Sequence, residues 1–228
     1  VNTDHIYTKV WNEIISKYNL VVDEEFFSFF IQGKNDLSFL KDMFPNITSE
    51  QVNEISNLKD ELFIEILKKN DDDIMIKGAF KFISSNVNKK MCIVTSCNKK
   101  SAEYIVEKTG IKDYMQFVIA SEDCVNHKPN KEPYDKAINK LNALKENCTI
   151  FEDSISGYKS AKSCNVGNIC LIINEKSNEE VKNLNEFKIK NYDDYKYDLI
   201  NNKTLNNIKE LIINELSKKK IIIDVIFD

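Results

Sequence analysis

The chain has 228 residues and a formal net charge of −4, which fits one globular domain, or one domain with an insert. All 32 basic residues are lysine, because the sequence contains no arginine, and this excludes arginine fingers and guanidinium clamps on phosphate. With 5 glycines there is no G-x-G-x-x-G or Walker A loop, and the slight negative charge argues against nucleic-acid binding.

The first third of the chain has a helical pattern and contains no convincing strand over 1–75. Apolar residues recur at helical spacing over 6–15, and four phenylalanines within 26–30 are typical of a core. The segment 48–67 begins with Thr-Ser-Glu-Gln, which resembles a capping box at the start of a helix. The three aspartates at 71–73 then end the pattern, and we interpret them as a solvated hinge.

From about residue 77 short apolar runs alternate with amphipathic helices. We expect strands over 91–94, 117–120, 148–151 and 168–173, and helices over 101–109, 132–144 and 156–164. Beyond these, we expect an irregular polar segment over 175–203, a helix over 204–216 and a last strand over 221–227. Fully apolar strands separated by helices predict an α/β fold, a Rossmann-like core whose parallel sheet is covered on both faces.

Polar side chains directly follow several of the expected strands. In an open parallel sheet, ligands bind beyond the carboxyl ends of the strands, so these side chains should converge on one rim. Carboxylates there could hold Mg²⁺, and lysine and hydroxyls could hold a phosphate, an arrangement that suits phosphoryl transfer. The candidate residues are Thr95, Ser96, Asn98, Lys128, Glu152, Asp153 and Asp228.

Three short motifs give the sequence a specific resemblance. They are Cys92-Ile-Val-Thr95-Ser96, Lys128-Pro129 and Phe151-Glu-Asp-Ser-Ile-Ser-Gly157. In order and spacing they resemble the second, third and fourth motifs of the haloacid dehalogenase superfamily, in its branch of β-phosphoglucomutase-like and phosphoglycolate-phosphatase-like enzymes. The resemblance implies that the threonine and serine bind phosphate, that the lysine screens the charge of phosphate and nucleophile, and that the two acids hold Mg²⁺.

The helical residues near the start of the chain resemble the cap of this family, which is inserted between its first and second motifs. The resemblance therefore implies a small all-helical cap domain over 10–75 and a core domain over 76–228 plus 1–9. Lys34 is a candidate substrate contact in the cap, because cap loops close over the site. A solvated lysine at a helix start is an equal alternative for this residue.

The first motif of the family, D-x-D-G, is absent from its usual place near the start of the chain. Its leading strand and first aspartate occur instead over 221–228, ending in Asp228. Three arrangements would each explain this: a circular permutation, a segment cut from tandem domains, or residues out of order around an active-site loop. We favour the last two, because a permutant would have a mobile chain end at its nucleophile.

The chemistry that the resemblance implies is nucleophilic catalysis by a carboxylate. Asp228 would attack phosphorus and form an aspartyl-phosphate, with Thr95 and Lys128 beside the phosphate. The acid two positions later in the family motif, absent here, would protonate the leaving oxygen and then activate water. Mg²⁺ would be held by Asp228 and Asp153, and by Glu152 either directly or through water. We therefore expect a Mg²⁺-dependent phosphatase that acts on a small phosphorylated metabolite. A sugar phosphomutase of the β-phosphoglucomutase type is the alternative, and an inactive binding module is a second one if D-x-D-G is truly absent.

Each of these residues also has a structural interpretation. Thr95 would cap the helix that follows it, the acids at 152–153 would cap theirs, and Lys128 would be one solvated lysine among many. The 6 cysteines form no C-x-x-C pair, no apolar run reaches transmembrane length and no signal peptide is visible. We therefore expect a cytoplasmic monomer or homodimer with no nucleic-acid or membrane partner.

Overall fold

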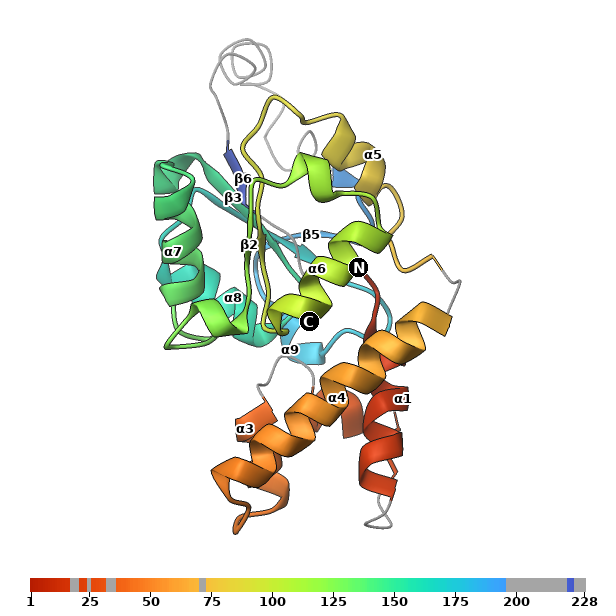
Figure 1. The fold of residues 1–228 in the computed structure, drawn as a ribbon. Coiled ribbons are helices and arrows are strands. Elements are labelled where there is room, and N and C mark those ends of the chain that lie inside the picture. Colours follow the sequence, from red (N-terminus) through yellow and green to blue (C-terminus); the bar gives the residue numbers. More distant parts are fainter. Residues whose placement is uncertain (17–20, 24–25, 32–35, 70–72, 196–220, 224–228) are drawn as a thin grey trace.

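A helical part and an α/β part make up the molecule (Figure 1). The structure is a computed structural model, and it describes residues 1–16, 21–23, 26–31, 36–69, 73–195 and 221–223. Within these ranges no helix combines the length and the apolar character needed to cross a membrane.

The helical part consists of α1 (Asp4–Ile15), a π-helical turn η2 (Phe27–Ile31), α3 (Asp36–Met43) and α4 (Ser49–Lys69). The predicted capping box is confirmed at the start of α4. Gln51 N–H donates to Thr48 Oγ1 at 3.2 Å, and Thr48 N–H donates to Gln51 Oε1 at 3.0 Å. The boundary expected between residues 9 and 10 falls inside α1, and the assignment of 10–75 as a cap domain stays a prediction.

The α/β part follows the predicted alternation of strands and helices. Its elements are α5 (Ala79–Ser84), β1 (Ile93–Val94), α6 (Lys99–Lys108), η3 (Lys112–Tyr114), β2 (Val118–Ile119), η4 (Ser121–Asp123), α7 (Glu132–Lys140), η5 (Lys145–Asn147), β3 (Cys148–Glu152), α8 (Ile155–Ser163), β4 (Asn168–Ile172), α9 (Glu179–Asn183), β5 (Phe187–Ile189) and β6 (Ile221–Ile223). The prediction of an irregular segment over 175–203 was wrong for two stretches within it, which form α9 and β5. The helix expected over 204–216 lies outside the described residues.

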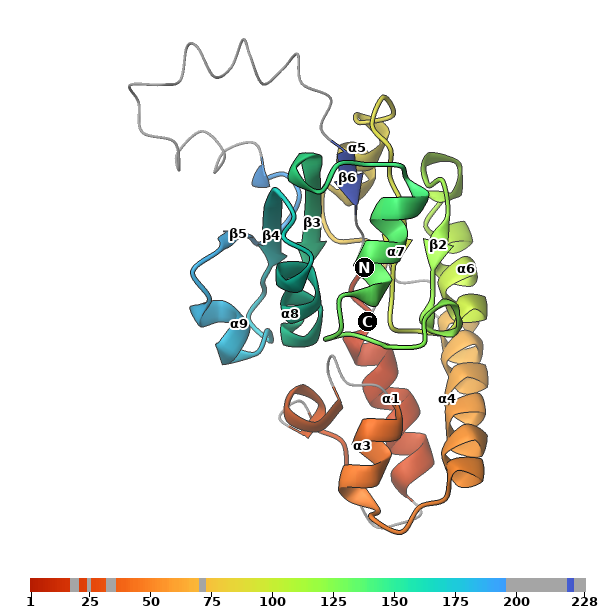
Figure 2. The ribbon, with the colours of Figure 1, turned by 90° about the vertical axis from the view of Figure 1, so that its left-hand side faces the viewer.

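All described strand pairs are parallel, as predicted. The strands β5, β4, β3 and β6 form one sheet in that order, and β1 pairs with β2. Helices α7 and α8 cover one side of the strands and α6 lies on the other (Figures 1 and 2). The Rossmann-like α/β fold is therefore confirmed. Because β6 runs parallel to β3, its carboxyl end points toward the same sheet edge as that of β3.

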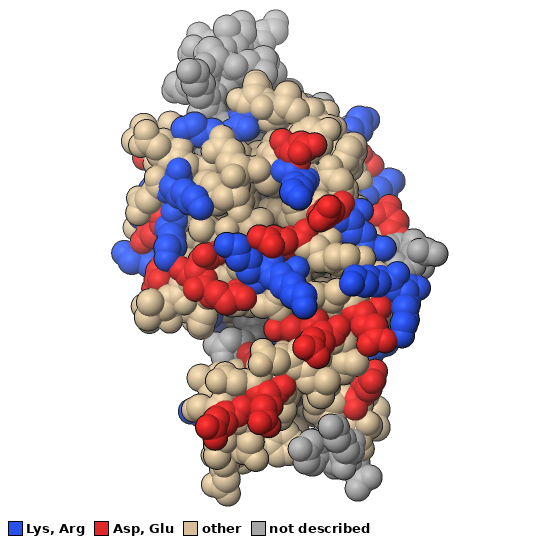
Figure 3. Space-filling view, viewed as in Figure 1, with Lys and Arg blue, Asp and Glu red and all other residues tan. Residues whose placement is uncertain are grey.

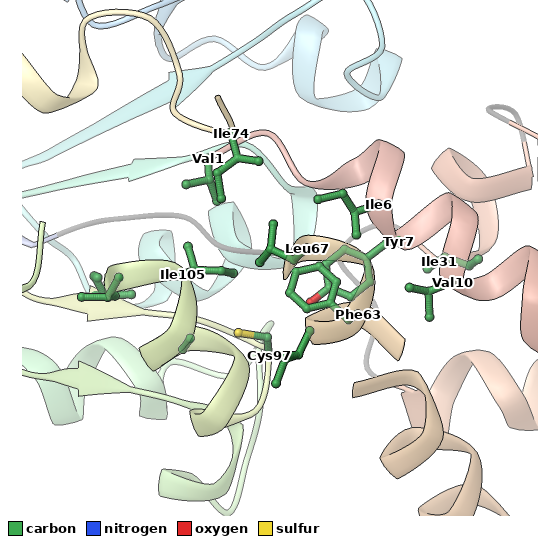
Figure 4. Close-up of a cluster of buried hydrophobic side chains, with 14 of the residues drawn as sticks. Val1, Ile6, Tyr7, Val10, Ile31, Phe63, Leu67, Ile74, Cys97 and Ile105 are labelled. Carbon is green, nitrogen blue, oxygen red and sulfur yellow. The ribbon is translucent and has the colours of Figure 1, made fainter. Parts of the chain in front are cut away.

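One apolar cluster joins the helical part to the α/β part. Tyr7 of α1 stacks on Phe63 of α4 with 4.4 Å between ring centroids, and Cys97 and Ile105 of the α/β part belong to the same buried cluster (Figure 4). Burying a large apolar side chain contributes about 1.5–3 kcal/mol. The shared cluster therefore holds the helical part against the carboxyl end of β1, where the candidate residues begin.

Candidate active site

The carboxyl end of β1 turns sharply at the first candidate residue. Thr95 is buried, and its N–H donates to Ile119 O at 2.9 Å, which continues the pairing of β1 with β2. Thr95 Oγ1 accepts from Cys97 N–H at 3.1 Å. The helix that follows is capped by Asn98, whose Oδ1 accepts from Ser101 N–H at 2.7 Å. The capping role weighed for Thr95 thus belongs to Asn98.

A buried ion pair links the ends of the two sheets. Lys128 Nζ lies 2.5 Å from Glu152 Oε1, at the end of β3, and donates to Val94 O of β1 at 3.3 Å. The side chains of Lys128 and Glu152 are only 3% and 0% exposed. Lys128 therefore is not one of the many solvated lysines. It is fixed between the second and fourth motifs by its partners.

The environment of Glu152 keeps this carboxylate ionised. Burial alone would raise the pKa of Glu152, but the Lys128 ammonium and the hydroxyl of Tyr134 outweigh it and hold the pKa below its usual range. Tyr134, on α7, donates to Glu152 Oε1 at 2.5 Å. A charged carboxylate without these donors would be costly to bury, so the three side chains form one electrostatic unit.

The second oxygen of Glu152 is held by the start of α8. Ser154 donates to Glu152 Oε2 through its hydroxyl at 3.1 Å and through its N–H at 3.2 Å. The same hydroxyl accepts from Gly157 N–H at 2.9 Å, which makes Ser154 the N-cap of α8. A Cβ on Gly157 would lie 1.9 Å from Glu152 Oε1. The glycine of the fourth motif is therefore required because the carboxylate fills the space beside it.

A cavity of about 550 Å³ lies between the helical part and this rim. Ser96, Asn98 and Lys128 line it from the rim. The helical part contributes Asp4, Tyr7, Trp11, Asp36, Lys59 and Asp60 to the same cavity. The structure thus brings together several candidate residues at one cavity, and residues far apart in the sequence enclose it.

The helical side of the cavity holds a charged cluster that the sequence did not predict. Lys59 Nζ lies 2.7 Å from Asp36 Oδ2 and 3.0 Å from Asp60 Oδ1. The pKa of Asp60 is raised, because burial outweighs the opposing effects of Lys59 and of a hydrogen bond with Asn98. Asn98 thus connects the helical part to the rim. A lysine on the apolar face of α4, in line with Phe63, is the sequence signal that could have found this cluster.

Two of the candidate residues, Lys34 and Asp228, lie outside the described residues. Glu152 and Asp153 offer the oxygen ligands that Mg²⁺ takes in proteins, and Asp153 is half-buried directly beyond β3. Within the described ranges no group of three or more His, Cys, Asp or Glu side chains could enclose a metal ion. Asp153 therefore fits a magnesium ligand, whereas Glu152 is 0% exposed and both of its oxygens already accept hydrogen bonds, from Lys128, Tyr134 and Ser154. Further ligands would come from water, backbone oxygens or Asp228.

The sequence matches the family model of haloacid dehalogenase-like hydrolases over residues 1–171. The chain belongs to this family. It is 29% identical over 111 residues to a phosphorylated carbohydrates phosphatase of Thermotoga maritima, a match that covers 49% of this chain and 50% of that protein. The chain thus spans about half the length of this curated relative.

Solved structures of the family share the fold over nearly the whole chain. A HAD hydrolase from Entamoeba histolytica superposes with a TM-score of 0.72 at 21% identity, covering 93% of this chain and 94% of that one. A β-phosphoglucomutase from Clostridium difficile superposes with a TM-score of 0.73 at 19% identity, covering 92% and 93%. The predicted membership of the haloacid dehalogenase superfamily and its fold are confirmed.

Proposed function

We propose that the chain is a Mg²⁺-dependent phosphatase that hydrolyses a small phosphorylated metabolite. The observation that carries this proposal is the buried Lys128–Glu152 pair, which spans the ends of β1 and β3 at the edge of the cavity. Lys128 would compensate the phosphate charge, and Thr95 and Ser96 would bind phosphate oxygens. The similarity to a phosphatase of phosphorylated carbohydrates supports the same class of substrate.

The proposed nucleophile is Asp228, whose carboxylate would attack phosphorus while the P–O bond to the substrate's organic part breaks. The leaving oxygen would take a proton from water and depart as the alcohol, and a second water would hydrolyse the aspartyl-phosphate to inorganic phosphate and free Asp228. Asp228 lies outside the described residues, but β6 runs parallel to β3 and points toward the edge that carries Glu152. Asp153 and Asp228 would hold Mg²⁺, with Glu152 binding directly or through water, and the ion would offset the repulsion between carboxylates and phosphate when bound. Residues 10–75 would serve as the cap over the core of 76–228 and 1–9, and we expect a cytoplasmic monomer or homodimer with no nucleic-acid or membrane partner.

A screen over small phosphate monoesters tests the activity itself. With Mg²⁺ we expect the purified protein to release inorganic phosphate from some of them, and in excess EDTA we expect release to stop. A sugar phosphomutase is the alternative, because it shares the candidate residues. Incubating hexose monophosphates with a trace of bisphosphate separates the two activities: isomerisation without phosphate release would identify the mutase. No reaction under any condition would favour the inactive binding module.

The hydroxyl of Tyr134 is expected to support the magnesium site. In Tyr134→Phe, Glu152 Oε1 loses a donor at 2.5 Å while the ring keeps its buried position. Because the partners that orient metal ligands typically contribute about tenfold or more to metal affinity, the Mg²⁺ concentration for half-maximal activity should rise about tenfold. The matched control is Tyr158→Phe, because the Tyr158 hydroxyl contacts Glu186, just before β5, and not Glu152. An unchanged Mg²⁺ dependence in Tyr134→Phe would remove Tyr134 from this role.

A further inference from the structure

A loop of residues 121–127, which we call the rim loop, forms one wall of the cavity. Glu122, Cys124 and His127 of this loop line the cavity, and Lys128 follows the loop directly and lines it too. A molecule bound in the cavity therefore meets the rim loop beside the lysine. The conformation of the loop decides the shape of this wall.

The tip of the rim loop is not held by burial. Val125, Asn126 and His127 are all exposed, and Val125 is 86% exposed although it is apolar. An exposed segment gains little stability from apolar contacts. The conformation of the tip therefore depends on its hydrogen bonds.

Glu132, the first residue of α7, supplies these hydrogen bonds. Its Oε1 accepts from Val125 N–H at 2.8 Å, and its Oε2 accepts from the N–H and the side-chain amide of Asn126, each at 2.9 Å. One turn further along α7, Lys136 donates to the carbonyl of Asp123. Because residues four apart lie on the same face of a helix, one face of α7 holds the loop at two places.

Glu132 differs from an ordinary surface carboxylate. Lysines and acidic side chains are interspersed over the face of the α/β part that Figure 3 shows, and such exposed charges contribute little by themselves. The hydrogen bonds from Val125 and Asn126 lower the pKa of Glu132, so its carboxylate is ionised at neutral pH. Hydrogen bonds to an ionised group are about twice as strong as neutral ones. The carboxylate is therefore well suited to fix an exposed loop.

The end of the rim loop is anchored independently of the Glu132 carboxylate. Asn130 N–H donates to His127 O at 2.9 Å, and Asn130 O accepts from Ser160 Oγ of α8 at 2.6 Å. The buried ion pair fixes Lys128. Loss of the carboxylate should therefore release the tip of the loop and leave Lys128 in place.

We propose that Glu132 is a positioning residue that holds the rim loop in the conformation that receives the organic part of the substrate. The inference rests on the proposed function, in which the cavity binds a phosphate monoester. A loop that is ordered before binding loses less conformational entropy when the ester binds. Glu132 thus acts on the affinity for the organic part and leaves the phosphate contacts at Thr95 and Lys128 unchanged.

Glu132→Gln tests the inference, because it keeps the size of the side chain and replaces one acceptor oxygen by an NH₂ group that cannot accept. At least one N–H of the loop then faces a donor. With glucose 6-phosphate as the probe, we expect KM to rise about tenfold and kcat to change by less than about twofold. A merely structural role would reduce the folded fraction, so kcat would fall at constant KM. An unchanged KM overturns the inference.

Inorganic phosphate and a second variant are the controls. Inorganic phosphate lacks the organic part, so its affinity as a competitive inhibitor should be equal in Glu132→Gln and in the wild type. Glu107→Gln, at an exposed position on α6, should keep the wild-type KM. An equal loss of affinity for phosphate and for the ester would overturn the inference, because it would place the effect at the phosphate contacts.

The inference and the proposed function can fail separately. If neither protein hydrolyses any phosphate monoester, the proposed function is refuted, and calorimetric titration then measures binding in place of KM. About tenfold weaker binding of glucose 6-phosphate by Glu132→Gln than by the wild type would still support the inference. Equal binding by both proteins, or no binding by the wild type, would overturn it.

Discussion

Replacing Lys128 by methionine should destabilise the protein and nearly abolish hydrolysis. The variant leaves Glu152 buried with no cation beside it, and breaking a buried ion pair by removing one partner typically costs about 3–5 kcal/mol. Loss of the positive charge at the proposed phosphate position should lower the rate at least about a hundredfold. Denaturant unfolding measures the free energy of unfolding, and phosphate release at saturating Mg²⁺ measures the rate.

The pH dependence of the stability loss in Lys128→Met identifies its cause. In the wild type the pKa of Glu152 is held below its ordinary value of 4.5, so its stabilising contribution is present above that pH and is lost as the pH falls through the lowered pKa. In Lys128→Met, burial should instead raise this pKa and the carboxyl should take up a proton. The stability deficit of the variant should therefore shrink between pH 7 and about pH 4.5.

A control lysine from the same loop completes this experiment. Lys131 is exposed and pairs with Asp135 at 3.5 Å on the surface, so Lys131→Met should change stability by no more than about 0.5 kcal/mol. If Lys128→Met and Lys131→Met have equal stability and equal activity, the Lys128–Glu152 pair does not have the role assigned to it.

Replacing Gly157 by alanine should have a comparable effect through sterics alone. The added Cβ would lie 1.9 Å from Glu152 Oε1 and 2.1 Å from Oε2, distances that no real contact tolerates. Either the carboxylate leaves Lys128 or the first turn of α8 moves. Overpacking costs about 1–3 kcal/mol, and displacement of the ion pair adds to it. We expect unfolding at lower denaturant concentration and a rate at least about a hundredfold lower.

The matched control for this glycine is on the same helix. Ser163→Ala, an exposed position near the end of α8, should leave stability and rate unchanged within error. A crystal structure of Gly157→Ala would show which group moves. Wild-type activity in Gly157→Ala would mean that the position of Glu152 beside this glycine does not matter for the reaction.

The motifs made the rim of the site predictable from the sequence. Each apolar strand is followed directly by polar residues, and this pattern predicted the positions of Thr95 and Glu152. Side chains at the carboxyl ends of parallel strands meet at one edge of the sheet. The structure pairs Lys128 with Glu152, and the screening of phosphate and nucleophile that the resemblance implied stays a prediction. The order of the strands and of helices α6, α7 and α8 was predictable for the same reason.

The parts of the fold and of the site that could not be predicted have no local sequence pattern. The segment β5 is a short edge strand of only Phe-Lys-Ile, so neither length nor full burial distinguishes it from a loop. Lys59 and its partner Asp36 are 23 residues apart, and no spacing rule joins them. Tyr134 has the pattern of a core aromatic residue, and only the fold brings its hydroxyl to Glu152. Contacts of this kind depend on tertiary packing.

The most direct test of the account is a Mg²⁺ titration of phosphomonoester hydrolysis by the wild type and by Asp153→Ala. Asp153 lies half-buried beyond β3, and its neighbour Glu152 is already held by Lys128. The control is Asp113→Ala, at an exposed position in η3. We predict saturable activation by Mg²⁺ in the wild type and in the control, and a rate at least about a hundredfold lower in Asp153→Ala. Equal, Mg²⁺-independent activity in all three proteins would contradict the proposed metal-dependent phosphatase.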